Sequence, residues 1–124
     1  MNIFGILAGI FGALGVGAGA FGAHALADKL EPRMFEVFET AARYQMYHAL
    51  ALLGVAWVWT ATSQSTASQV AGWAFTAGIV LFSGSLYAMA FSGIRVLGAI
   101  TPIGGVGFIV GWIALAVAMS KTGV

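Results

Sequence analysis

The distribution of charged residues constrains this chain more than any other feature. Its five Lys and Arg and four Asp and Glu residues fall in three places, residues 28–43, Arg95 and Lys121. Charge-free runs remain at 1–27, 44–94 and 96–120. A helix that crosses the hydrocarbon of a bilayer needs about 20 apolar residues. Each outer run therefore accommodates one span and the middle run two, which predicts four transmembrane helices in one domain, residues 1–124.

The composition excludes an ordinary soluble domain. The chain is 60% hydrophobic and 7% charged, whereas about 25% of residues are charged in a typical soluble domain. We place the spans at about 2–26, 42–61, 69–91 and 102–120. The first run lacks a preceding Lys or Arg and is longer than a signal-peptide core, so we expect no cleaved signal. The absence of Cys excludes disulfides, and a net charge of +1 gives no case for nucleic-acid binding.

The connection between the first two spans, about 28–41, has helical spacing of its apolar residues. Phe35 and Phe38 alternate with charged positions, and Pro32 suits the first position of a helix. We predict a short amphipathic helix on the membrane surface that runs or turns into the second span. An ordinary solvated connecting helix is the alternative. The fold class is thus an all-α polytopic membrane protein, a four-transmembrane-helix bundle with an interfacial helix.

Glycines crowd the first and last spans. Small residues three or four apart let neighbouring helices approach closely in a membrane. These glycines either pack within one bundle or form a contact between protomers, and their number favours a small homo-oligomer. They are Gly5, Gly9, Gly12, Gly15, Gly17, Gly19 and Gly22 in the first span, and Gly104, Gly105, Gly107 and Gly111 in the last. Two further signals mark helix ends: Gly93 can take the left-handed cap of the third span, and Pro102 suits the first helical position of the fourth. If the fourth helix begins earlier, near Leu97, Pro102 would instead kink it.

Orientation follows from the Lys and Arg residues in the connections. The side that holds the first and third connections carries Lys29, Arg33, Arg43 and Arg95, and the other side carries Lys121. Because basic residues are retained in the cytoplasm, both termini are predicted on the non-cytoplasmic side.

A group of polar residues maps to one end of the predicted bundle. Ionisable residues inside a membrane normally face the bundle interior and find a partner there. The expected partners are His24 of the first span, and Glu39 or backbone carbonyls of the connections. The candidate residues of this cluster are His24, Arg43, Tyr44, Gln45, His48 and Arg95, with Tyr47 and Thr101 nearby.

Three interpretations of this cluster compete. It is a hydrogen-bonded plug that fixes helix packing, or a binding site for a lipid headgroup, an anion or a small polar solute. Two arginines suit a phosphate or carboxylate. The third interpretation is metal or acid–base chemistry, but two histidines fall short of the three or four ligands of zinc. No nucleophile or phosphate-loop motif is present, so we predict no catalytic residue, metal or cofactor, and do not expect an enzyme.

Several motifs in order resemble a known family. GAFGAHAL, YQMYHALALL, SGSLYAM and ITPIGGVGFIVGW are similar to small four-span membrane proteins of domain-of-unknown-function family 423. That family includes YgdD-like proteins of bacterial inner membranes and the animal transmembrane protein 256. The resemblance covers the full chain and implies four transmembrane helices in the bacterial inner membrane. It implies no activity, and it marks His24, Tyr44, Gln45 and His48 only as family-typical positions.

The resulting expectation is a structural or accessory membrane protein that binds lipid or a partner protein. The alternative, a transporter or channel for a small solute or proton, needs a polar path across the bilayer. The second span argues against such a path, because beyond His48 it reads ALALLGVAWVW. The expected partners are the bilayer, a bound lipid and further copies of the chain.

Overall fold

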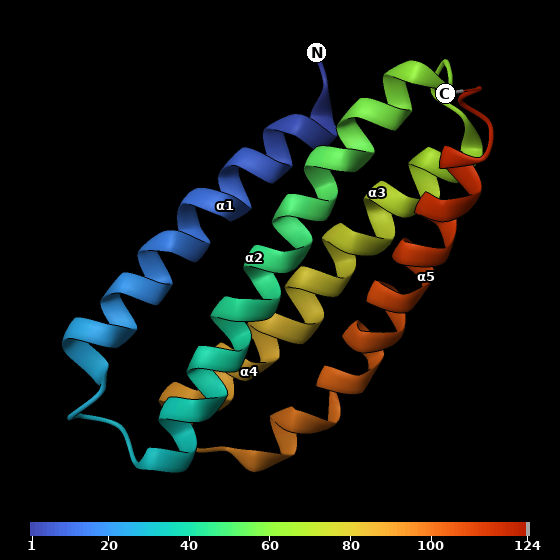
Figure 1. The fold of residues 1–124 in the computed structure, drawn as a ribbon. Helices are drawn as coiled ribbons and strands as arrows, with labels where there is room; N and C mark the ends of the chain where they lie inside the picture. The colour runs from blue at the N-terminus through green and yellow to red at the C-terminus, as the bar shows by residue number, and fades with distance from the viewer. Residues whose placement is uncertain (124) are drawn as a thin grey trace.

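The computed structural model describes residues 1–123 as helices that pack side by side (Figure 1). Four long helical segments follow one another up and down the molecule. The first is α1 with a π-helical turn, the second is α2 alone, the third joins α3 and α4 through a π-helical turn, and the fourth is α5 after a 3-10 turn. Their bounds are α1 Ile3–Phe21, η1 Gly22–Leu26, α2 Pro32–Ala61, α3 Thr66–Gly78, η2 Ile79–Ser83, α4 Gly84–Ser92, η3 Arg95–Ala99 and α5 Thr101–Met119.

Three of the four segments are long and apolar enough to cross a membrane. They are Ile3–Leu26, Thr66–Ser92 and Arg95–Met119, which lie within a few residues of the predicted first, third and fourth spans, apart from the earlier start at Arg95. The left-handed cap at Gly93 is confirmed, with φ of 71°, and Pro102 lies in the first turn of α5. The predicted second span, about 42–61, lies within α2 but is not among these three.

Helix α2 is longer than the predicted second span. It begins at Pro32 and runs without interruption to Ala61. Met34, Val37 and Phe38 are buried and pack in one cluster with residues of α4 such as Leu86. The apolar face of the connection is therefore covered by protein, and residues 32–41 form the first turns of α2, continuous with the predicted second span.

The helices lie in a fixed order, and the chain ends meet at one end of the molecule. In Figure 1, α1 and α5 lie on the two flanks, with α2 and the α3–α4 segment between them, and both termini lie at the same end. The terminal end of the core is built on Phe4, which is 1% exposed. Its ring contacts Trp59 and Trp73 edge to face, at 5.4 and 5.3 Å between centroids.

Glycines allow the closest helix contacts. A Cβ at Gly104 would collide with the backbone nitrogen of Phe82, and Gly107 and Gly111 face Gly78 and Phe75. The predicted small-residue face of α5 therefore packs within the chain. The glycines of the first segment fall into two groups. An added Cβ at Gly15 or Gly22 would meet a side chain of α2, whereas one at Gly9, Gly12, Gly17 or Gly19 has no atom within 4 Å.

Candidate functional site

The polar residues of the YQMYH stretch lie well inside α2 and not at its beginning. Because the helix starts at Pro32, Tyr44, Gln45 and His48 lie near its middle. Gln45 and His48 are each 5% exposed, and Tyr44 is half-buried. The side chains of Gln45 and His48 are therefore enclosed by neighbouring helices.

Gln45 connects three helical segments. Its side-chain Nε2 donates to the carbonyl oxygen of Phe11 in α1 at 2.9 Å. Its Oε1 accepts from the hydroxyl of Tyr87 in α4 at 2.7 Å. A buried amide costs free energy unless it is hydrogen-bonded, and here both ends of the amide have partners. Gln45 thus fixes how α1 and α4 pack on α2.

The imidazole of His48 has a partner on each ring nitrogen. Nδ1 lies 2.7 Å from the carbonyl oxygen of Tyr44, and Nε2 accepts from the indole Nε1 of Trp112 in α5 at 3.1 Å. A carbonyl only accepts and an indole N–H only donates, so Nδ1 carries the hydrogen and the ring is neutral. This arrangement uses His48 as a hydrogen-bonded packing residue between α2 and α5.

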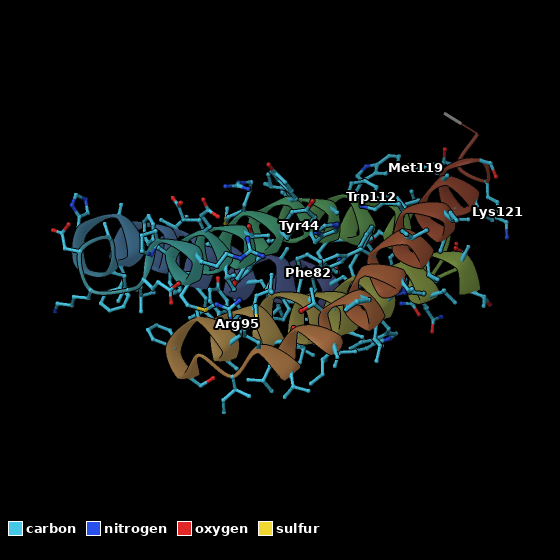
Figure 2. The ribbon with its side chains drawn as sticks, turned by 90° about the horizontal axis from the view of Figure 1, so that it is seen from below. Tyr44, Phe82, Arg95, Trp112, Met119 and Lys121 are labelled. Carbon is cyan, nitrogen blue, oxygen red and sulfur yellow. The ribbon has the colours of Figure 1, made fainter. Side chains whose placement is uncertain are left out.

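Aromatic rings fill the space around His48. Its ring stacks on Phe108 at 3.5 Å between centroids, with 5° between planes. Tyr44 packs on Phe82 at 4.7 Å, and Phe75 packs on Trp112 at 5.1 Å. Figure 2 shows Tyr44 and Phe82 in the middle of the molecule. We call His48, Tyr44 and these four residues the aromatic core.

His24 lies away from the aromatic core. It is exposed in the π-helical turn after α1, and within residues 1–123 its side chain forms no hydrogen bond with His48, whose two ring nitrogens bond to Tyr44 and Trp112. The expected pairing of the two histidines is therefore wrong. The physical reason is that the first segment continues past the level of Gly15, which lies against Met46 of α2, so its last turn reaches the charged part of α2.

The two arginines of the predicted cluster lie in different hollows. Arg43 is exposed and lines a hollow of about 330 Å³ between α1 and α2, together with Glu39 and Tyr47. Arg95 lines a second hollow of about 380 Å³, which Arg33 of α2 also lines. Figure 2 places Arg95 and Lys121 on opposite sides of Tyr44 and Phe82 along the molecule.

Four contributors to these sites escape prediction from the sequence. Tyr87 and Trp112 lie in apolar segments that carry other aromatic residues as well, and Phe108 is one of nine phenylalanines. Arg33 counts in the sequence only as one charge of the connection. The signal that Tyr87 and Trp112 offer is a hydrogen-bonding group inside an apolar segment, although Trp112 is itself 47% exposed.

The described residues contain no group of three or more His, Cys, Asp and Glu residues placed to hold a metal ion. Other polar side chains are paired between helical segments: Ser83 donates to the carbonyl oxygen of Ala41 at 2.7 Å, and the hydroxyls of Ser85 and Thr101 lie 2.6 Å apart. Within residues 1–123, one buried side-chain polar atom, Nε1 of Trp59, has no hydrogen-bond partner. The interior is therefore a paired polar and aromatic core.

Long apolar helices around a paired polar interior define an all-helical, multi-pass membrane protein. The chain belongs to the family described as "Protein of unknown function (DUF423)", whose model matches residues 18–105. This confirms the family predicted from the sequence motifs.

Named relatives extend the match to nearly the whole chain. It is 49% identical over 121 residues to a UPF0382 membrane protein of Staphylococcus epidermidis, covering 98% of both chains. It is also 49% identical over 121 residues to the UPF0382 membrane protein YwdK of Bacillus subtilis, again covering 98% of both. No solved structure matches the chain.

Proposed function

We propose that this protein crosses the bacterial inner membrane four times as a four-helix bundle and acts as an accessory protein that binds lipid on its outer surface. The aromatic core carries the proposal. The hydrogen-bonding groups of the His48 and Gln45 side chains bond to other residues of the protein, and the ring of Phe108 covers one face of the imidazole. Interaction with lipid or a partner then falls to the exposed residues.

The two faces of α2 support a fourth crossing. Its exposed positions before residue 44 are largely charged, including Glu36, Glu39 and Arg43. After residue 44 its large exposed side chains are Tyr47, Leu50, Leu53 and Trp57. Residues 44–61 span about 27 Å at about 1.5 Å per residue, close to the hydrocarbon thickness. The polar side chains that lower the hydropathy of this stretch face the protein, where they cost little.

The positions of the termini support the predicted orientation. Both termini lie at one end of the molecule (Figure 1), where Lys121 is the basic side chain. Lys29, Arg33, Arg43 and Arg95 belong to the other half. This asymmetry favours non-cytoplasmic termini.

The open face of α1 supports association of two or more copies. Helix α1 belongs to the least buried of the three apolar segments, and Gly9, Gly12 and Gly17 have space for a neighbouring backbone. We therefore propose a small homo-oligomer that packs through α1. Native mass spectrometry tests it, because a dimer that Gly12→Leu dissociates supports this contact and a monomer in every detergent contradicts it.

Reconstitution tests the accessory role against transport. Purified protein in liposomes that hold a pH-sensitive dye is given a pH step and, separately, gradients of small solutes. We expect proton and solute leaks equal to those of empty liposomes, with an ionophore as the positive control for a detectable leak. A flux that His48→Phe or Gln45→Leu abolishes would overturn the accessory role and establish a path through the aromatic core.

A further inference from the structure

Two arginines from distant parts of the sequence line one hollow at the charged end of the molecule. Arg33 comes from the first turn of α2 and Arg95 from the 3-10 turn before α5. The hollow has a volume of about 380 Å³, and Met34, Met89, Thr101 and Pro102 are among its other lining residues. It is separate from the aromatic core, which is built farther along the same helices.

The charged side chains that line this hollow are all positive. Its lining residues include two guanidinium groups and no carboxylate. Arg33 has an ion pair with Glu36 at 3.6 Å, but both side chains are more than 60% exposed, so water screens that pair. Among residues 1–123 no ion pair to Arg95 occurs within 4 Å. By contrast, the hollow beside Arg43 also contains Glu39.

The hollow lies where apolar surface meets the charged end. It opens at the connection between the apolar segments Thr66–Ser92 and Arg95–Met119. Ile94, Val96 and Ile103 nearby in sequence are 53%, 73% and 62% exposed. Apolar side chains this exposed beside arginines are typical of the membrane interface, where lipid headgroups lie.

We propose that Arg33 and Arg95 bind the phosphate of an anionic phospholipid headgroup. The planar guanidinium donates paired hydrogen bonds that match phosphate oxygens. Pro102, which lines the hollow and is exposed, and the exposed Ile94, Val96 and Ile103 nearby in sequence supply apolar surface for the glycerol and the first acyl carbons, which a free phosphate lacks. This proposal deepens the lipid binding of the proposed function, because it names the lipid class and the residues.

Native mass spectrometry of delipidated protein in a neutral detergent tests the assignment. Phosphatidylglycerol and phosphatidylcholine are titrated separately into the wild type, Arg33→Gln, Arg95→Gln and the double variant. Arg43→Gln is the matched control, since it removes an exposed arginine outside the hollow. Arg33→Lys with Arg95→Lys keeps the charge but removes the paired geometry. Circular dichroism confirms that each variant remains folded.

We expect the wild type to prefer phosphatidylglycerol, and each Gln variant to bind it at least about fivefold more weakly, with Arg43→Gln nearly unchanged. The phosphatidylglycerol affinity of the double Lys variant should fall between that of the wild type and those of the Gln variants. Equal binding of both lipids by the wild type would overturn the proposal, and so would an equal loss in Arg43→Gln. Displacement of the lipid by millimolar inorganic phosphate would assign the hollow to a free anion instead. The liposome flux experiment tests the accessory role and this titration tests the lipid site. Either proposal can therefore fail while the other stands.

Discussion

The ring of His48 lies parallel to the ring of Phe108, with 3.5 Å between centroids and 5° between planes. This face-to-face contact joins α2 to α5, and the hydrogen bond from Trp112 to Nε2 of His48 holds the imidazole edge. A neutral imidazole can satisfy both contacts at once, whereas a protonated ring would lose the acceptor that the indole requires. The pair therefore explains why a histidine is stable in an otherwise apolar interior.

Replacing His48 by Ala should destabilise the protein. The change leaves a cavity beside Phe108 and removes the acceptor of Trp112, so we expect the free energy of unfolding to fall by about 2–4 kcal/mol. Unfolding in mixed detergent micelles measures it, and the melting temperature should fall as well. His24→Ala is the control and should change stability by less than about 0.5 kcal/mol, because His24 is exposed. Unchanged stability of His48→Ala with loss of ligand binding would show that the residue serves a binding site.

The hydrogen bond between Tyr87 and Gln45 should be measurable as an energetic coupling. Tyr87→Phe removes the hydroxyl and leaves Oε1 of Gln45 without its donor, whereas the same change in a Gln45→Leu background removes nothing further. Hydrogen bonds between membrane helices average about 0.6 kcal/mol in double-mutant cycles, so we expect a coupling of about 0.5–1.5 kcal/mol. A coupling near zero in equilibrium unfolding would mean that the bond at 2.7 Å contributes nothing to packing.

The sequence predicts the apolar segments well because the constraint that produces them is local. Charge-free runs bounded by Arg43, Arg95 and Lys121 limit where helices can cross. The end of α4 is equally local, because Gly93 adopts the positive φ of the helix cap by virtue of being glycine. The start of α2 is different. Residues 32–41 have the pattern of an interfacial helix, and only their packing on α4 makes them part of a longer one.

The sequence predicts part of the candidate site, the positions along one helix, and does not predict the partners on other helices. Spacing along one helix places Gln45 and His48 on the buried side, as predicted, since helical periodicity determines that relation. The partners of these residues depend on how helices align with one another. Tyr87 pairs with Gln45 and Trp112 with His48 across different helices, and no pattern within a single segment specifies that alignment. The same alignment brings Arg33 to Arg95 in place of Arg43.

The close contact at Gly104 should tolerate no added carbon. A Cβ there would collide with the backbone nitrogen of Phe82 and lie 2.8 Å from its Cα, and backbone atoms cannot move aside as a flexible side chain can. We expect Gly104→Ala to lower the free energy of unfolding by about 1–3 kcal/mol. Gly54→Ala is the matched control in α2, where an added Cβ meets no atom within 4 Å. If both variants are equally stable, α5 does not pack against η2 at the described distance.

The number of crossings and the orientation can be tested with single cysteines, because the chain has none of its own. Asp28→Cys, Thr66→Cys and Ser120→Cys place a thiol at exposed positions before α2, after α2 and after α5. A membrane-impermeant maleimide is applied to intact cells and, as a control for reactivity, to opened membranes. With four crossings and non-cytoplasmic termini, Thr66→Cys and Ser120→Cys react in intact cells and Asp28→Cys reacts only after opening. Like behaviour of Asp28→Cys and Thr66→Cys would mean that α2 does not cross. Labelling of Asp28→Cys alone in intact cells would retain the four crossings but reverse the orientation, so the basic residues of the first and third connections would then face outward.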